Sequence, residues 1–155
     1  MANVYLIPTV LAEECFDTIP AYVTSAIKDC HVFFVENERT TRRYFKQLWK
    51  NYVPDEEIVI DDYEWYLITN ETKGAFKRLL KEGKNIGIVS EAGCPGIADP
   101  GQELIAIAQE MGAEIKPLAI EQRRSNRNLV ATVAVPAIEL EPAFRTYHAQ
   151  VHLQR

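Results

Sequence analysis

The stretch from residue 85 to residue 112, NIGIVSEAGCPGIADPGQELIAIAQEMG, decides the fold. It opens with a short apolar run, passes through a loop with three glycines and two prolines, and continues into apolar residues at helical spacing. This pattern predicts a buried strand at 85–89 and a helix at 102–111 that Gly112 ends. The stretch therefore indicates one βα unit, with a long loop at 90–101 between its two elements.

The same alternation continues on both sides of this unit. Apolar and β-branched runs predict four further strands, at 4–7, 31–35, 58–60 and 114–118. Amphipathic spacing predicts three further helices, which start at Pro20, Arg39 and Asn70. Strands that alternate with helices are typical of the α/β class, so we expect an open, mostly parallel five-stranded sheet with helices on both faces.

Helical spacing also predicts which side chains face the core. Three sets follow: Tyr22, Val23, Ala26 and Ile27 in the first helix, Tyr44, Phe45, Leu48 and Trp49 in the second, and Phe76, Leu79 and Leu80 in the third.

The composition is that of a soluble globular protein. The chain has 155 residues, 47% hydrophobic and 25% charged, which is enough for one sizeable core. No apolar run approaches the roughly 18 residues of a membrane span, and we recognise no signal peptide, so we expect a cytoplasmic protein without membrane association. Three cysteines without C-x-x-C spacing predict neither a disulfide framework nor a metal site.

Residue usage changes near the end of the last predicted strand. All seven glycines lie between Gly74 and Gly112. We therefore expect an α/β domain over residues 1–118 and an atypical, lysine-free C-terminal tail over 119–155. The β-prone run 129–135 could add a strand, or the tail could be a non-native C-terminus, and the sequence leaves both interpretations open.

The charge is unevenly distributed. A formal net charge of −5 argues against general affinity for nucleic acid, which needs surplus cations. The second predicted helix nevertheless carries basic residues at i, i+4, i+7 and i+11, namely Arg39, Arg43, Lys46 and Lys50. Such a stripe is either a solvated helix face or a contact surface for an RNA backbone.

The loop at 90–101 has the composition of a rigid ligand loop, with a plain structural turn as the alternative. Glycine lets a backbone approach a ligand closely, and proline reduces the entropy lost on ordering. The loop lacks the G-x-G-x-x-G, G-x-x-x-x-G-K and G-x-S-x-G patterns, which argues against dinucleotide-binding Rossmann enzymes, P-loop NTPases and hydrolases. In a parallel sheet it would meet the loops at 8–12 and 36–39, at the carboxyl ends of the strands.

The loop also resembles a known signature. The residues Ser90-Glu91-Ala92-Gly93-Cys94-Pro95, followed by Ala98-Asp99-Pro100-Gly101, are similar to the S-(D/E)-A-G-x-P and D-P-G elements of the tetrapyrrole methylase superfamily. The segments 4–9 and 35–41 resemble that family's opening strand and its E-D-T-R segment, in the same order. Within the superfamily, the match points to the branch of small-subunit ribosomal RNA 2'-O-ribose methyltransferases.

The resemblance implies an enzyme that transfers a methyl group from S-adenosyl-L-methionine (SAM), with an rRNA ribose as the acceptor. The cofactor-binding positions that it implies are Pro8, Ser90, Glu91, Ala92, Gly93, Cys94, Pro95 and Ile97. The matched E-D-T-R segment supplies Glu36, Arg39 and Thr41, which we expect to contact substrate, although Glu36 could instead pair with Arg39. No catalytic base can be assigned.

Two alternative functions compete with an rRNA methyltransferase. A non-catalytic binding or dimerisation module would keep the loop as architecture only. A precorrin or porphyrin methylase is disfavoured, because that branch has a G-G-D-P loop where this chain reads S-E-A-G-C-P. We also expect a homodimer.

The chain departs from the family pattern at three places. The first loop lacks the usual glycine, since residues 10–14 read VLAEE. Asn37 and Glu38 stand where Asp and Thr are usual. The match stops at Leu118, so we expect the second domain of the family to be absent.

Overall fold

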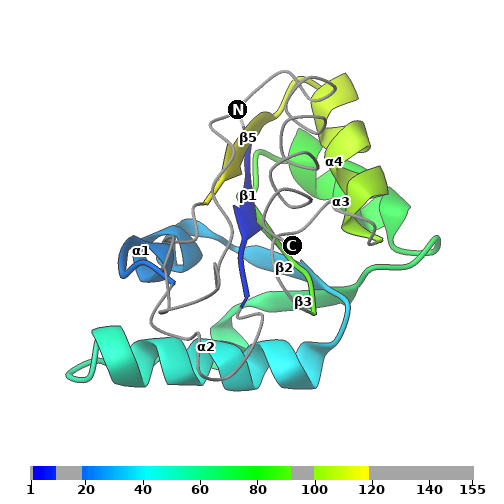
Figure 1. Ribbon diagram of the computed structural model, residues 1–155. Helices are drawn as coiled ribbons and strands as arrows, with labels where there is room; N and C mark the ends of the chain where they lie inside the picture. Colours follow the sequence, from blue (N-terminus) through cyan, green and yellow to red (C-terminus); the bar gives the residue numbers. More distant parts are fainter. Residues whose placement is uncertain (1, 10–18, 92–99, 119–155) are drawn as a thin grey trace, which may run out of the picture.

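The structure is a computed structural model that describes residues 2–9, 19–91 and 100–118. In these ranges five strands alternate with four α-helices and one short 3₁₀ helix (Figure 1). The strands are β1 (Asn3–Ile7), β2 (Val32–Val35), β3 (Glu64–Leu67), β4 (Ile86–Val89) and β5 (Glu114–Pro117). The helices are α1 (Tyr22–Asp29), α2 (Glu38–Tyr52), α3 (Lys73–Lys81) and α4 (Gly101–Glu110), with the 3₁₀ helix η2 at Ile60–Asp62.

All five strands run parallel in one sheet, in the order β3-β2-β4-β1-β5. The predicted α/β class and five-stranded sheet are confirmed. The sheet is wholly parallel because helical crossovers join its successive strands. β1 and β4 lie side by side near its centre, with Ile7 opposite Val89 in the register.

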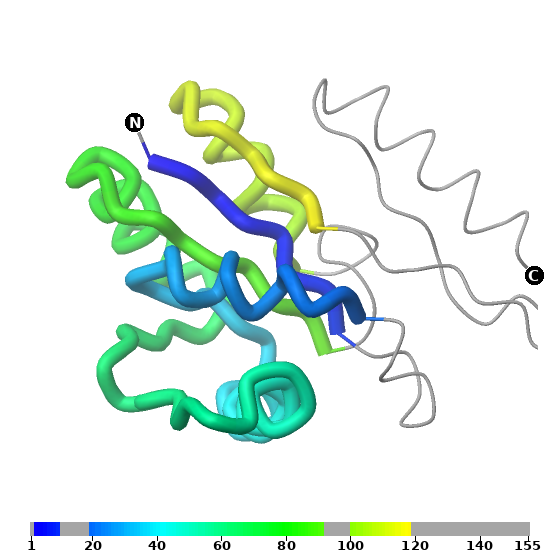
Figure 2. Tube along the Cα trace, turned by 90° about the vertical axis from the view of Figure 1, so that its left-hand side faces the viewer, coloured from blue at the N-terminus to red at the C-terminus, as the bar shows by residue number. Residues whose placement is uncertain are grey.

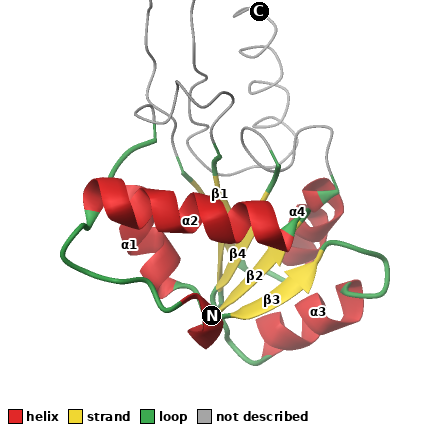
Figure 3. Ribbon diagram, turned by 90° about the horizontal axis from the view of Figure 1, so that it is seen from below, coloured by secondary structure: helices red, strands yellow, loops and turns green. Residues whose placement is uncertain are grey.

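Helices cover both faces of the sheet, as predicted. α1 and α2 pack on one face and α3 and α4 on the other (Figure 3). The first face buries Ile27, Phe33 and Phe45 in one core cluster, and the second buries Phe34, Phe76 and Leu104 in another. Since successive side chains of a strand point to opposite faces, the neighbours Phe33 and Phe34 belong to different clusters.

The middle of the sheet has no room for a side chain at Gly87. A β-carbon at this position would lie 2.6 Å from the Phe33 ring and 2.8 Å from the Ile7 side chain. Glycine is therefore required by close packing between strands. Gly112, with φ +75°, has a different role, because it ends α4 in the left-handed conformation that glycine adopts readily.

The third strand was predicted in the wrong place. Residues 58–60 enter the η2 turn, and the strand that pairs with β2 is β3, at Glu64–Leu67. β3 is an edge strand whose Trp65 packs on Phe33 and whose Tyr66 stacks on Phe34, with ring centroids 5.1 and 5.0 Å apart. Aromatic pairing across strands therefore outweighs the more apolar run 58–60.

Two helix details also differ from the prediction. Tyr22 is 46% exposed, whereas its neighbour Val23 is fully buried, because Tyr22 stands at the first position of α1, outside its inward face. α3 begins at Lys73 and not at Asn70, since a turn intervenes in which the Thr72 hydroxyl donates to the Leu67 carbonyl at 2.7 Å.

Candidate functional site

The loops after β1, β2 and β4 meet at one edge of the sheet. These strands are neighbours and parallel, so Pro8, Glu36 and Ser90 all follow carboxyl ends on the same side. Figure 2 shows β1 and β4 ending side by side. From here the chain leaves β1 for α1 on one face and leaves β4 for α4 on the other. Such a divergence of connections is where open α/β sheets bind ligands.

Buried polar groups connect the residues that follow β1 with α2 and with the end of β4. The Tyr44 hydroxyl, on α2, donates to the Pro8 carbonyl at 2.6 Å. Thr9 and Ser90 are 6% and 5% exposed, and the Thr9 hydroxyl donates a long bond of 3.4 Å to the Ser90 carbonyl. The ends of β1 and β4 are thus tied to each other and to α2.

A second set of contacts, the Glu91 brace, joins Glu36, Thr40 and Glu91. The backbone N–H of Glu91 donates to Glu36 Oε2 at 2.9 Å, and the Thr40 hydroxyl donates to Glu91 Oε1 at 2.9 Å. The brace links the residue after β2, the first turn of α2 and the second residue after β4. It holds Glu91 through both its backbone and its side chain.

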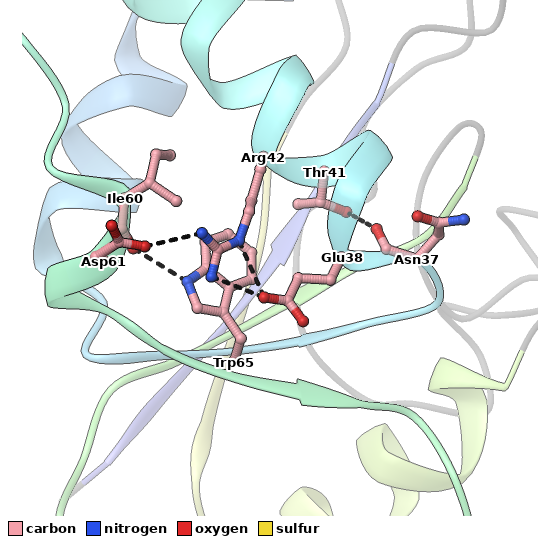
Figure 4. Close-up of polar contacts among 7 residues, drawn as sticks. All are labelled: Asn37, Glu38, Thr41, Arg42, Ile60, Asp61 and Trp65. Carbon is pink, nitrogen blue, oxygen red and sulfur yellow. Dashed lines mark hydrogen bonds and ion pairs between the residues drawn. The ribbon is translucent and has the colours of Figure 1, made fainter.

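The start of α2 is held by its own side chains. Asn37 caps the helix, because its Oδ1 accepts from the Thr40 N–H at 3.1 Å. The Thr41 hydroxyl donates to the Asn37 carbonyl at 2.8 Å, a contact drawn in Figure 4, and Thr41 is 4% exposed. Asn37, one of the departures from the family pattern, is therefore the N-cap of α2 in this chain.

Arg42 is fixed on the flank of α2, away from the loops. Its guanidinium bonds Asp61 at 2.9 Å and Glu38 at 2.7 Å, and it lies over the Trp65 ring, 5.0 Å from the ring centroid (Figure 4). The Trp65 indole N–H in turn donates to the Ile60 carbonyl at 3.1 Å. The hydrogen bond to Asp61 holds the pKa of Arg42 above its usual range, so the group stays charged. This cation is neutralised within the chain.

Cys30 and His31 have structural surroundings. Cys30 is buried, its thiol donates to the Ala26 carbonyl at 3.3 Å, and burial raises the pKa of this thiol well above its ordinary range. His31 is exposed, and its Nδ1 accepts from the Asn85 N–H at 3.2 Å. In the described ranges, no three His, Cys, Asp or Glu side chains come together as a metal site requires.

Comparison with known proteins identifies the family, although no family model matches the chain. The chain is 30% identical over 120 residues to the ribosomal RNA small subunit methyltransferase I of Bacillus subtilis, a match that covers 76% of the chain. It is 34% identical over 65 residues to the protein of the same name in Leptospira biflexa, and 54% identical over 39 residues to that of Synechocystis.

The chain is homologous to ribosomal RNA small subunit methyltransferase I. The resemblance to this branch of the tetrapyrrole methylase superfamily is thereby confirmed. The matches cover 37%, 25% and 14% of the length of the B. subtilis, L. biflexa and Synechocystis methyltransferases, so the chain spans little more than a third of these relatives at most.

The structure brings part of the predicted methyltransferase site together. Pro8, Glu36, Ser90 and Glu91 meet at the carboxyl edge, and Arg39 is exposed on the first turn of α2 beside it. Glu36 accepts from the Glu91 backbone, and none of the described salt bridges joins it to Arg39. The remaining positions predicted to bind the cofactor lie outside the described residues: Ala92, Gly93, Cys94, Pro95 and Ile97.

Sequence analysis missed two residues at this edge. Thr40 belongs to the matched segment 35–41, yet its partner Glu91 is 51 positions away, so no local pattern could predict the contact. The periodicity predicts Tyr44 on the core face, where its ring is indeed buried, but it does not predict the hydrogen bond from its hydroxyl to Pro8.

The described part of the chain contains no helix long and apolar enough to cross a membrane.

Proposed function

We propose that the chain forms the SAM-binding α/β domain of a methyltransferase that acts on the 2'-hydroxyl of a ribose in small-subunit ribosomal RNA. One observation carries the proposal: the loops after β1, β2 and β4 converge at the switch point of a parallel sheet, in a chain homologous to proteins named ribosomal RNA small subunit methyltransferase I. We assign the domain to residues 1–118, and give the tail 119–155 no part in cofactor binding. A homodimer in the cytoplasm remains our expectation.

The charges at the carboxyl edge suit this cofactor. SAM carries a positive sulfonium and a positive ammonium, and when bound it supplies an electrophilic methyl group. Two carboxylates, Glu36 and Glu91, stand at the edge, where each has one oxygen engaged in the Glu91 brace. Of the two arginines nearest to this edge, Arg42 is turned toward Asp61 and Glu38, and Arg39 is exposed beside the edge.

The described residues would bind and orient the reactants, and the base that accepts the proton of the 2'-hydroxyl during methyl transfer is assigned to none of them. Pro8, Ser90 and Glu91 would hold the cofactor together with the loop residues Ala92, Gly93, Cys94, Pro95 and Ile97. Glu36 would keep Glu91 in place through the Glu91 N–H, and exposed Arg39 would face the substrate. Thr41, which is 4% exposed and bonds the Asn37 carbonyl, would support the start of α2 and would not touch the substrate. Fixing two reactants in a productive orientation accounts for a large share of catalysis.

Isothermal titration calorimetry with SAM and with its demethylated product tests the cofactor assignment. We expect binding by the intact chain and its loss in Gly93→Val, because a side chain there would block close approach of the loop backbone. Gly74→Val is the matched control, since a β-carbon at Gly74 meets nothing within 4 Å. A folded chain that gives no heat with either ligand would instead support a non-catalytic module, and unchanged affinity in Gly93→Val would refute the loop assignment.

Methyl transfer is tested with isotopically labelled SAM and small-subunit ribosomal RNA. A methyl group on the ribose 2'-oxygen protects the adjacent phosphodiester from alkaline cleavage, because that cleavage requires the free hydroxyl. We expect label in RNA at an alkali-resistant position. Label on a base, or on a porphyrin substrate offered in place of RNA, would overturn the proposed acceptor.

A further inference from the structure

The outer face of α2 carries four cations in one row. This basic stripe consists of Arg39, Arg43, Lys46 and Lys50, and all four are exposed. At 3.6 residues per turn they fall within a narrow band along the helix. The opposite side of α2 is buried in the core through Tyr44, Phe45, Leu48 and Trp49. The stripe therefore faces away from the sheet.

Among the described residues no side chain of the stripe forms a salt bridge, which is also true of Lys77, Lys81, Lys84 and Lys116. The salt bridges of the described residues engage Lys28, Arg42, Lys73 and Arg78. Glu38 in the first turn of α2 and Asp61 beyond the helix both form their salt bridges with Arg42, on the flank of the helix (Figure 4). The salt bridges of α2 are thus confined to that flank.

The position of the stripe connects it with the candidate site. Arg39 precedes Thr40, whose hydroxyl bonds Glu91 in the brace at the carboxyl edge. From Arg39 to Lys50 the stripe runs about 17 Å along the helix axis, at a rise of about 1.5 Å per residue. One end therefore borders the site, and the rest leads away from it as a row of charges.

We propose that the basic stripe binds the phosphate backbone of an RNA strand and so guides a ribose of that strand to the carboxyl edge. This inference rests on the proposed function for its choice of RNA as the polyanion. Phosphate contacts by Lys and Arg fix register and orientation without reading sequence. The stripe holds the strand, and selection of the target nucleotide occurs elsewhere.

A row of cations also explains how an acidic protein can bind RNA. The net charge of −5 repels a polyanion over the surface as a whole. At about 0.1 M salt the Debye length is about 10 Å, so a phosphate in contact with the stripe is screened from more distant acidic groups. Binding is then confined to α2 and depends strongly on salt.

Fluorescence anisotropy with a labelled single-stranded RNA oligonucleotide, titrated with the full chain at several salt concentrations, tests the proposal. The test variant is Arg43→Gln with Lys46→Gln. The matched control is Lys77→Gln with Lys81→Gln, which removes two exposed cations from α3 and changes the net charge equally. Thermal melting by circular dichroism checks that all three proteins are folded.

We expect the test variant to lose about ten-fold in RNA affinity near 0.1 M salt, with a slope of log affinity against log salt that is shallower by about 1.4. The control should retain the affinity and slope of the unmodified chain. An equal loss in both variants would overturn the proposal, because it would show a response to net charge alone. Unmodified protein that fails to bind RNA at low salt would overturn it as well.

A second arm separates RNA from other anionic partners and from the proposed function. Cosedimentation with phosphatidylserine vesicles should give no stripe-dependent binding, and a membrane preference over RNA would refute the inference. Calorimetry of the unmodified chain with SAM reports on the proposed function independently. SAM binding without stripe-dependent RNA binding would refute only the stripe, and failure of SAM binding would refute the cofactor assignment.

Discussion

The amino and carboxyl edges of the sheet use polar side chains in opposite ways. At the amino edge, Asn85 accepts from the Asn3 N–H at 3.1 Å and donates to the Asp29 carbonyl at 3.0 Å, while its own N–H reaches His31. Its amide group is thus engaged on both sides by the chain. At the carboxyl edge, Glu36 and Glu91 each engage one carboxylate oxygen in the Glu91 brace.

The difference separates stability from ligand binding in one small sheet. A neutral amide whose donor and acceptor are both satisfied by backbone serves to hold strands and helices together. Carboxylates with remaining acceptor capacity, such as half-buried Glu36 and exposed Glu91, contribute little to folding and can still bind a ligand. Mutations at the two edges should therefore affect different measurements.

We expect the largest change in the free energy of unfolding at Gly87, which lies between the two edges of the sheet. Gly87→Ala forces a β-carbon into contact with Phe33 and Ile7, and we expect the free energy of unfolding to fall by about 3 kcal/mol. Gly74→Ala, in α3 where nothing lies within 4 Å, should instead raise it by roughly 0.5 to 1 kcal/mol. Denaturation in urea measures the free energy of unfolding of both variants. Similar free energies for the two would show that a β-carbon is tolerated at Gly87.

The amino edge should lose stability when Asn85 is truncated. Asn85→Ala removes two hydrogen bonds to backbone groups, so we expect a loss of about 2 kcal/mol. The exposed Asn70→Ala should change unfolding by less than about 0.5 kcal/mol. If Asn85→Ala changed the SAM affinity and left the free energy of unfolding unchanged, the assignment of stability to the amino edge and of ligand binding to the carboxyl edge would be wrong.

Cys30 also lies near the amino ends of the strands. We expect its buried thiol to lower the free energy of unfolding at alkaline pH. Burial keeps its thiol protonated in the folded state, whereas the unfolded chain releases the proton above about pH 8.5. Folding then opposes ionisation, so the contribution of Cys30 is complete below that pH and falls by about 1.4 kcal/mol per pH unit above it. Urea denaturation from pH 7 to 10 should show this slope, and Cys30→Ala should reduce it; an unchanged slope would exclude the thiol as its source.

The smallest effect on stability is expected at the carboxyl edge. Glu36→Ala removes the acceptor of the Glu91 N–H, which can bond to water instead, so unfolding should change by about 0.5 kcal/mol or less. SAM affinity should nevertheless fall, by about ten-fold, or roughly 1.4 kcal/mol. Glu57→Ala, at an exposed position, is the control for both measurements. A destabilisation as large as that of Asn85→Ala would remove the distinction between the two edges.

Local patterns predicted most of the fold but misplaced β3. Helical periodicity located α2 and its buried Tyr44, Phe45, Leu48 and Trp49, because 3.6-residue spacing is a property of the backbone within a few turns. The run 58–60 is more apolar than the edge strand, so hydrophobicity alone favoured the wrong segment. The choice of Glu64–Leu67 depends on Trp65 and Tyr66 meeting aromatic rings of β2, which are distant in sequence.

The features of the candidate site also fall into those that local sequence predicts and those that only the folded chain shows. The sequence by itself determined the α/β class, the glycine-rich loop after β4 and the residues Glu36 and Glu91, because composition and motif are written in neighbouring positions. Only the tertiary structure decided that Glu36 holds the Glu91 backbone, that Thr40 bonds the Glu91 side chain and that Arg42 turns away to Asp61. These contacts follow from the strand order β3-β2-β4-β1-β5, which pairs segments far apart in the chain and which no local periodicity encodes.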